Sequence, residues 1–319
     1  MNYSSLLHKS IALLIILLQC IAASAGDAVR VGVAWKPGLT YGDRVVQTIE
    51  LAGGEAVILE QVRPAGFSYD SLTLQPQYVD ANGVLLPKEA ELVKRNTWHG
   101  SNAAQVLDGI DAVVFLGGGD ISSTLFRSPE PWGGETCDAT RDLSEYLTMA
   151  YCLDHDIPVL GLCRGMQMLS VVSGATMVQD LGTYFSALNV EYNNLHRSVS
   201  DANGNRHYVH HDVVITDRQS LIYNIMIDDS IKNVPSWHHQ VVGDVAGTSL
   251  KVTGVTPTQG YDVIEVVERT DKTFALGVQF HPEEAVRKHL ADESDATEFM
   301  RLYEGLNFFE ALIKAASGK

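Results

Sequence analysis

The fold is decided by Ile157-Pro158-Val159-Leu160-Gly161-Leu162-Cys163-Arg164-Gly165-Met166-Gln167, a stretch in which an apolar strand leads directly into a helix. A cysteine with a glycine two positions away on either side is typical of a nucleophile elbow, the tight turn that holds a reactive side chain at the end of a strand. Because Arg164 would begin the helix, its backbone N–H and the helix dipole would favour a thiolate and a developing oxyanion. The sequence therefore predicts an enzyme with Cys163 as its nucleophile.

Strands alternate with helices along the first half of the chain. Short apolar runs predict strands at 29–35, 56–60, 111–116 and 158–162, and helical patterns lie at 43–52, at 142–154 and from the elbow to about 174. This alternation predicts an α/β fold with a mostly parallel central sheet flanked by helices. In such sheets the functional residues gather at the carboxyl ends of the strands.

The second half of the chain has a different pattern. Strand-like segments separated by turn residues predict antiparallel additions to the same sheet, at 207–216, 250–254, 262–268 and 274–280. Residues 297–316 have apolar side chains at helical spacing and are predicted to close the fold as a last helix.

The first 25 residues are predicted to be a cleavable signal peptide. A weakly basic start at His8 and Lys9 precedes the apolar run 11–18, and Ala23-Ser24-Ala25 fits a cleavage site. Eight apolar residues are too few to span a bilayer. The prediction is a secreted or periplasmic protein whose mature part, residues 26–319, forms a single domain.

An insertion is expected at about 63–100, after the second strand. This segment has no clear periodicity and contains Pro64, Pro76 and Pro87. Connections of this length are often lids or binding elements, so the segment is expected to influence which substrates enter a cleft. Whether it forms a moving lid or a fixed wall is left open by the sequence.

The charge of the chain limits the partners that it can have. The formal net charge is −16, and removal of Lys9 with the signal peptide makes the mature chain one unit more acidic. Such a charge argues against nucleic acid and against anionic membrane surfaces, and the mature protein is expected to be free of the membrane. A small-molecule substrate remains the expected partner, and a homodimer remains open.

A second informative segment is Gly277-Val278-Gln279-Phe280-His281-Pro282-Glu283-Glu284, an apolar strand that ends in His-Pro-Glu. Pro282 favours an extended geometry, which would let His281 and Glu283 point to one side. A carboxylate in that position orients an imidazole, and the imidazole can take the proton of the cysteine. We therefore expect Cys163, His281 and Glu283 to form a catalytic triad.

With these motifs the chain resembles the class I glutamine amidotransferase-like superfamily, whose sheet is flavodoxin-like, and within it the stand-alone γ-glutamyl hydrolase branch that includes γ-glutamyl-γ-aminobutyrate hydrolase. The resemblance covers roughly residues 28–315. The segments that carry it, besides the elbow and the His-Pro-Glu strand end, are Gly117-Gly118-Gly119-Asp120-Ile121, Thr140-Arg141-Asp142 with Glu145, Ser236-Trp237-His238-His239-Gln240 and Gly260-Tyr261-Asp262-Val263-Ile264-Glu265.

The resemblance implies roles for further residues. Gly118 or Gly119 would provide one oxyanion N–H, and the backbone of Arg164 would provide the other. Gln167 would contact the α-amino or α-carboxyl end of the substrate, and His239 and Gln240 would line the same pocket. Gln167 is alternatively a helix residue whose side chain is satisfied by backbone, and the glycine run is alternatively a plain turn.

The function that this resemblance implies is thiol-dependent hydrolysis of a γ-glutamyl amide through a thioester on Cys163, without a cofactor. The leaving amine is not identified by the sequence. Two alternatives remain open: a glutaminase or γ-glutamyl peptide hydrolase with a different substrate, and a non-catalytic binding protein of the same fold. An intact Cys-His-Glu set argues against the binding protein, because binding alone does not need all three.

The remaining histidines and cysteines predict little. In a strand, His207 and His211 would share one face and His210 would point away, with no cysteine or carboxylate pair to complete a zinc site, so no metal is expected. His196 and His211 are expected near the pocket rim or on the sheet surface. A disulfide between Cys137 and Cys152 is possible in an exported protein, and two unbridged thiols are at least as compatible with the sequence.

Overall fold

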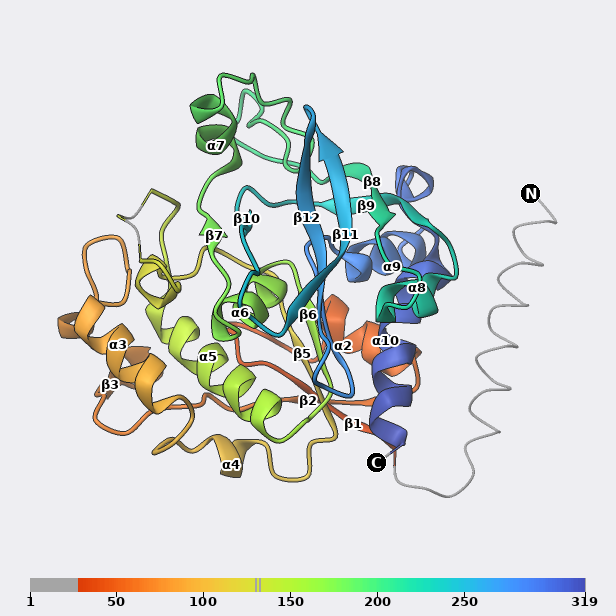
Figure 1. Cartoon of the computed structure of the whole chain (residues 1–319). Helices are drawn as coiled ribbons and strands as arrows, with labels where there is room; N and C mark the ends of the chain where they lie inside the picture. The colour runs from red at the N-terminus through yellow and green to blue at the C-terminus, as the bar shows by residue number, and fades with distance from the viewer. Residues whose placement is uncertain (1–27, 130, 132, 319) are drawn as a thin grey trace.

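A computed structural model describes residues 28–129, 131 and 133–318 of the chain (Figure 1). Nine strands of this part form one mixed sheet in the order β2-β1-β5-β6-β13-β12-β11-β8-β9. The first five of these run parallel, and the last four join antiparallel. Their bounds are β1 Arg30–Val33, β2 Glu55–Ile58, β5 Ala112–Phe115, β6 Val159–Leu162, β8 Val209–Ile215, β9 Ser230–Ser236, β11 Leu250–Thr258, β12 Tyr261–Arg269 and β13 Ala275–Val278. The predicted α/β fold is confirmed, with its parallel half and its antiparallel additions.

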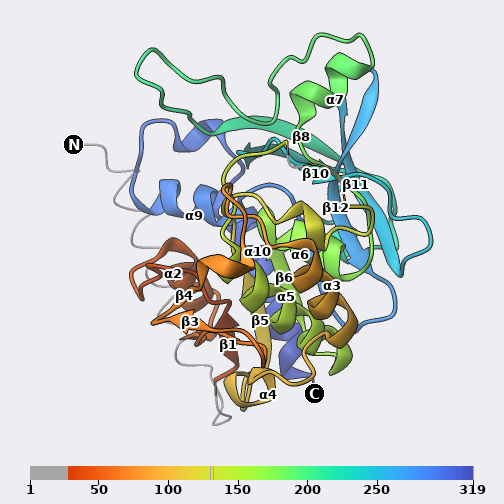
Figure 2. The same cartoon turned by 90° about the vertical axis from the view of Figure 1, so that its left-hand side faces the viewer.

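Helices cover both faces of the parallel half (Figures 1 and 2). Strand residues alternate between two apolar cores, since Val113 and Phe115 face one core while Ala112 and Val114 face the other. The first core is completed by α5 (Ala139–Asp154) and α6 (Arg164–Val172), and the second by α2 (Arg44–Leu51), α9 (Pro282–Leu290) and α10 (Leu302–Ser317). The two-sided burial explains the continuous apolar runs of these strands.

The segment 63–100 is a folded part of the first core. It contains the hairpin β3 (Tyr69–Asp70) and β4 (Thr73–Leu74), the 3-10 turn η1 (Pro76–Tyr78) and the helix α3 (Pro87–Asn96). The side chains of Leu74, Leu85 and Val93 are buried. Backbone N–H groups of Leu74 and Leu85 donate to the hydroxyls of Thr140 and Ser122, which ties the segment to neighbouring elements. None of the residues of this segment lines the cleft described below, so the expected influence on substrate entry is not seen in the cleft lining.

Several elements differ from the prediction. The helix α9 begins at Pro282, where an extended strand end was expected, because proline is well suited to the first position of a helix. The strand β9 was missed, since it is an edge strand that contains Pro235 and lacks clear alternation. The last helix begins at Leu302, five residues later than predicted.

The smaller elements are the strands β7 (Met177–Val178) and β10 (Val241–Val242), which pair with each other, and the helices α4 (Ala103–Val106), α7 (Leu181–Ala187) and α8 (Leu221–Met226), with η2 (Ser123–Leu125) and η3 (Ala296–Glu298) as 3-10 turns. No helix in the described ranges is long and apolar enough to cross a membrane. The predicted signal peptide lies outside these ranges. Cys137 and Cys152 are buried, and no disulfide joins them.

Candidate active site

The turn between β6 and α6 holds Cys163 in a strained backbone conformation, with φ at 51°. L-residues rarely adopt such a φ, and a side chain placed there is directed out of the turn. A Cβ on Gly165 would come within 2.4 Å of the carbonyl oxygen of Phe115 in β5, and a Cβ on Gly161 within 2.6 Å of the backbone of Gly165. Only glycine fits at both positions, so the elbow predicted from the sequence is present.

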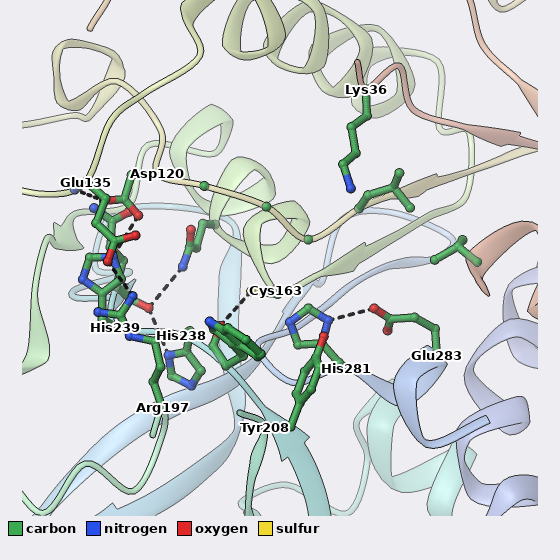
Figure 3. A pocket seen from close by; sticks show the side chains of 18 of the residues that line it. Lys36, Asp120, Glu135, Cys163, Arg197, Tyr208, His238, His239, His281 and Glu283 are labelled. Carbon is green, nitrogen blue, oxygen red and sulfur yellow. Dashed lines mark hydrogen bonds and ion pairs between the residues drawn. The ribbon is translucent and has the colours of Figure 1, made fainter. Parts of the chain in front are cut away.

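Cys163 and His281 meet over the glycine run that follows β5. A Cβ on Gly117 would lie 2.6 Å from Cε1 of His281 and 3.6 Å from Cβ of Cys163, so both side chains crowd the same side of this loop. The Nδ1 of His281 lies 2.7 Å from Oε1 of Glu283, and the backbone N–H of His281 donates to the carbonyl of Pro235 in β9 (Figure 3). The structure thus brings the three predicted triad residues together.

His281 and Glu283 stabilise each other's charged forms. Burial disfavours the imidazolium form of His281, but Tyr208, Glu283 and Cys163 favour it, and the net effect raises the pKa of His281 well above 6.5. Burial raises the pKa of Glu283, but the charges of His281 and Arg44 lower it by more. The pKa of Glu283 is therefore below its usual value. A carboxylate beside a protonated imidazole is the charge state that this geometry favours.

The glycine loop is held from behind by a buried charge network. Arg141 of α5 donates through Nη2 to the carbonyls of Leu116, at 3.1 Å, and Gly117, at 3.0 Å, and its Nε lies 2.7 Å from Glu145. The guanidinium of Arg164 forms ion pairs with Asp142 and Glu145. The side chain of Arg164 is buried and does not line the cleft, so only its backbone remains available for the predicted oxyanion role. Arg141, Asp142 and Glu145 of α5 were part of the family resemblance, but their support of the glycine loop was not predicted.

A cleft of about 450 Å³ opens over Cys163. It is lined by every predicted site residue except Arg164, namely Cys163, His281, Glu283, Gly118, Gly119, Gln167, His239 and Gln240. Its volume lies in the range of small-molecule sites.

Residues 237–240 form one wall of this cleft. The carbonyl of Trp237 lies 4.0 Å from Sγ of Cys163. The amide nitrogen of Gln167 donates to the carbonyl of Gln240 at 3.1 Å, which matches the alternative in which Gln167 satisfies backbone. The ring of His239 is held between Asp120, at 2.9 Å from Nε2, and Asp180, at 3.1 Å from Nδ1. Both side-chain polar atoms of Gln240 are buried without a hydrogen-bond partner among the described residues.

The model of the family described as Peptidase C26 matches residues 89–283, which hold the elbow, the glycine loop and the His-Pro-Glu end. The chain belongs to the peptidase C26 family. This assignment confirms the class I glutamine amidotransferase-like resemblance, and residues 89–283 make up more than half of the chain.

Related proteins agree with this family assignment. The chain is 30% identical over 275 residues to a Mycobacterium tuberculosis protein named as a candidate glutamine amidotransferase, an alignment that covers 83% of this chain and 74% of that protein. It is 35% identical over 183 residues to the protein NtpR of Enterococcus hirae, covering 57% and 70%. A more distant match is γ-glutamyl-γ-aminobutyrate hydrolase of Escherichia coli, at 28% over 146 residues, covering 46% of this chain and 54% of that enzyme.

Solved structures share the fold of this C26 family member. A Thermoplasma acidophilum protein named as a candidate component of GMP synthase superposes with a TM-score of 0.52, at 15% identity, over 92% of this chain and 96% of that one. A chain of PurLQS from Thermotoga maritima gives the same TM-score at 13% identity, over 90% and 98%. At these identities the likeness concerns the fold alone.

Charged residues that the sequence did not single out also line the cleft. Figure 3 shows Asp120, Glu135 and Arg197 on the same side of Cys163 as the predicted His239, and Lys36 on another side. Glu135 accepts a hydrogen bond from Arg197 at 2.8 Å. Arg44 and Tyr208 lie on the cleft beside the triad. Asp120 directly follows the glycine run and has a local signal. Lys36, Glu135 and Arg197 lie in separate connections, and Arg44 is the first residue of α2.

The histidines are not where the sequence placed them. His207 and His210 are exposed, but His196 and His211 are buried, in contrast to the expected rim or surface position. Both lie against His238 and Glu265. The prediction failed because it considered neighbours in the chain, whereas antiparallel pairing brings distant residues together.

Proposed function

We propose that this peptidase C26 family member hydrolyses a γ-glutamyl amide bond, with Cys163 as nucleophile, His281 as acid and base, and Glu283 as the residue that orients His281. The observation that carries the proposal is the meeting of the elbow cysteine and the His281–Glu283 pair over the glycine loop in one cleft. One relative is named as a γ-glutamyl-γ-aminobutyrate hydrolase, which supports this class of substrate.

In the first half of the reaction the Cys163 thiolate attacks the γ-carbonyl carbon of the substrate. The electron pair of the C=O bond moves to oxygen and forms a tetrahedral oxyanion. As the C–N bond breaks, the imidazolium of His281 gives its Nε2 proton to the leaving amine, and a γ-glutamyl thioester remains on Cys163. The raised pKa of His281 supports this step, because it keeps the proton available.

The oxyanion has two candidate backbone donors. The carbonyl and the following N–H of a trans peptide point to opposite sides, so the bond from Arg141 to the Gly117 carbonyl directs the Gly118 N–H away from Arg141. Arg164 is the first residue of α6, where backbone N–H groups lack helical partners. These two groups would stabilise the developing negative charge.

The α-amino and α-carboxylate groups of a γ-glutamyl substrate require charges of both signs. Asp120 and Glu135 provide carboxylates, and Arg197 provides a guanidinium, on the same side of the cleft. We assign this side to the α-end of the substrate. Lys36 lies on another side of the cleft and is available to the amine side, whereas Arg44 lines the cleft while paired with Glu284.

In the second half a water molecule attacks the thioester carbonyl, and His281 takes its proton. The C–S bond breaks, the thiolate is restored, and glutamate leaves. No cofactor takes part in the proposed sequence.

The decisive experiment is release of glutamate from a panel of γ-glutamyl amides, glutamine and γ-glutamyl peptides. We expect release from at least one γ-glutamyl amide and none from the Cys163→Ala variant, and intact-mass measurement should detect an acyl adduct only with Cys163 present. Preference for glutamine or for peptides would favour the alternative substrates. No release from any compound, with binding retained, would favour the non-catalytic binding protein.

A further inference from the structure

Three histidines and one glutamate form a buried cluster in the antiparallel part of the sheet. His211 lies on β8, Glu265 on β12, His238 two residues after the end of β9, and His196 in the connection between α7 and β8. The four side chains are at most 5% exposed. The nearest ligand atoms of all four lie within 4.8 Å of one another.

One carboxylate oxygen is the centre of the cluster. Oε1 of Glu265 lies 3.0 Å from Nδ1 of His196, 3.3 Å from Nε2 of His238 and 3.8 Å from Nε2 of His211. All of these atoms, together with Oε2 of Glu265, are buried without a well-formed hydrogen bond to any described residue. Five such atoms at one place require an explanation, because buried polar groups are rarely left unsatisfied.

The outer nitrogens of the three rings show where their protons lie. Nδ1 of His238 faces the backbone carbonyl of Gln240 at 3.1 Å, and a carbonyl can only accept. This nitrogen must therefore carry the proton. In a neutral ring the other nitrogen, Nε2, which faces Glu265, then carries no proton and presents a lone pair.

The same reasoning holds for His196. Its Nε2 lies 2.9 Å from the hydroxyl of Thr258, whose own proton goes to the carbonyl of Thr256. The hydroxyl therefore accepts from the ring, and Nδ1 of His196 is left bare.

For His211, Nδ1 lies 3.1 Å from the hydroxyl of Thr256, which donates to the carbonyl of Asp212. The ring must again donate outward, so its Nε2 is bare as well. Three unprotonated ring nitrogens consequently face one carboxylate. The lone pairs of the nitrogens and the charge of the carboxylate repel one another unless a positive charge lies between them.

We propose that His196, His211, His238 and Glu265 bind one divalent metal ion of the zinc type. Imidazole nitrogens and a carboxylate oxygen are ordinary zinc ligands, and a tetrahedral ion with bonds of about 2.1 Å needs ligand atoms about 3.4 Å apart, close to the separations from Glu265 seen here. The outward hydrogen bonds fix the tautomers that metal binding requires.

The site is structural in character, because four protein ligands fill a tetrahedral ion and leave no position for substrate. It would join β8, β12 and the segment that begins at Ser236. That segment forms the wall next to Cys163, and the metal would therefore fix the wall of the cleft without taking part in the reaction.

The test measures metal content and the geometry of the bound ion in the whole protein. Metal-free protein is titrated with Zn²⁺ and, separately, with Co²⁺ as a spectroscopic probe. We expect one equivalent per chain, a rise in melting temperature, and the visible absorption of tetrahedral Co²⁺ without a thiolate charge-transfer band. Cys163→Ala should bind the same equivalent. No binding by the wild-type protein overturns the proposal in favour of a protonated histidine–glutamate cluster, and loss of binding in Cys163→Ala overturns it in favour of the catalytic thiol.

Two variants locate the ion. Glu265→Gln removes a ligand charge and should abolish the tetrahedral spectrum. Thr258→Val keeps all four ligands but removes the hydroxyl that accepts from His196 and donates to Thr256, and it should weaken Zn²⁺ binding about 10- to 100-fold. His210→Ala, an exposed histidine on the same strand as His211, is the matched control and should bind as the wild type does. If Glu265→Gln does not fold, Thr258→Val decides, and unchanged affinity in that variant contradicts the site.

Discussion

Glu283 orients His281 across a single intervening residue, with Oε1 of the carboxylate 2.7 Å from Nδ1 of the ring. The contact exists because Pro282 begins the helix α9, so His281 stands at the end of the connection from β13 while Glu283 lies in the first helical turn. Both side chains are nearly fully buried. The carboxylate therefore acts on the imidazole in surroundings where its charge is weakly screened.

The pH dependence of the enzyme should follow this contact. The carboxylate of Glu283 helps to raise the pKa of His281 above 6.5, so kcat/KM should fall on the alkaline side only above that pH. In Glu283→Gln the favourable charge is lost, the pKa of His281 falls, and the alkaline limb moves to lower pH. We also expect kcat to fall by about 10²- to 10⁴-fold.

Glu284→Gln is the matched control for this profile. Glu284 follows directly in α9 but contacts Arg44 and Arg287 instead of His281. In Glu284→Gln, kcat/KM should fall on the alkaline side at the same pH as in the wild type. An equal shift in both variants would show that the limb does not report the His281–Glu283 pair.

The elbow should tolerate no side chain at Gly165. Gly165→Ala places a methyl group 2.4 Å from the carbonyl oxygen of Phe115. The backbones of α6 and β5 at this contact are packed, so neither can shift without loss of stability. The free energy of unfolding should fall by at least about 1–3 kcal/mol. Gly42→Ala is the control, since its Cβ would meet its nearest atom at 3.9 Å. Thermal unfolding measures both, and equal melting temperatures would contradict the steric account.

The parallel half of the fold was predictable because each of its strands is buried on both faces. Such strands are continuous apolar runs, as at 112–115 and 159–162. The edge strand β9 has no such signal. Pro282 was interpreted as a mark of extended chain, although the same fixed φ also suits the start of a helix.

The site was predictable where its residues carry a local constraint. Gly161, Cys163 and Gly165 are fixed by one turn, and His281 and Glu283 by one helix start. The cluster of His196, His211, His238 and Glu265 has no local pattern, because its members come from four segments that meet only through antiparallel pairing. The cleft cations Lys36, Arg44 and Arg197 also lack a local pattern, because they come from separate segments that meet only in the folded chain.

The buried network behind the glycine loop should be essential for stability. Arg164→Met leaves the carboxylates of Asp142 and Glu145 without their shared partner, and burial already raises the pKa of Asp142 to about 6 against the effect of Arg164 and Ser122. Removing one partner of a buried ion pair costs about 3–5 kcal/mol. Urea unfolding should show this loss.

Arg218→Ala provides the comparison for an exposed ion pair. Arg218 contacts Asp229 on the surface, where solvent screens the pair, and the melting temperature should hardly change. If Arg164→Met were equally mild, the network would not be what holds α5 against α6.

The N-terminal segment should be removed on export. The apolar run 11–18 and the sequence Ala23-Ser24-Ala25 predict cleavage before Gly26. N-terminal sequencing of protein recovered from the periplasm or medium of a bacterial host expressing the full chain should begin at Gly26. Ala25→Arg should block processing, and a wild-type protein that keeps Met1 and stays in the cytosol would contradict the prediction.

Arg197 should bind the substrate without taking part in the chemistry. It pairs with Glu135 at the cleft, on the side that we assign to the α-end of the substrate, and it does not reach the triad (Figure 3). Loss of a charge-assisted hydrogen bond costs about 1.5–3 kcal/mol, so Arg197→Ala should raise KM by roughly 10- to 150-fold and change kcat little. Arg206→Ala is the control, because Arg206 supports the same loop through the carbonyl of Ser198 without lining this cleft. Steady-state kinetics on the best γ-glutamyl amide separates the two effects: a KM that rises equally in both variants would assign the change to the loop, and a fall in kcat alone would place Arg197 in the chemical step.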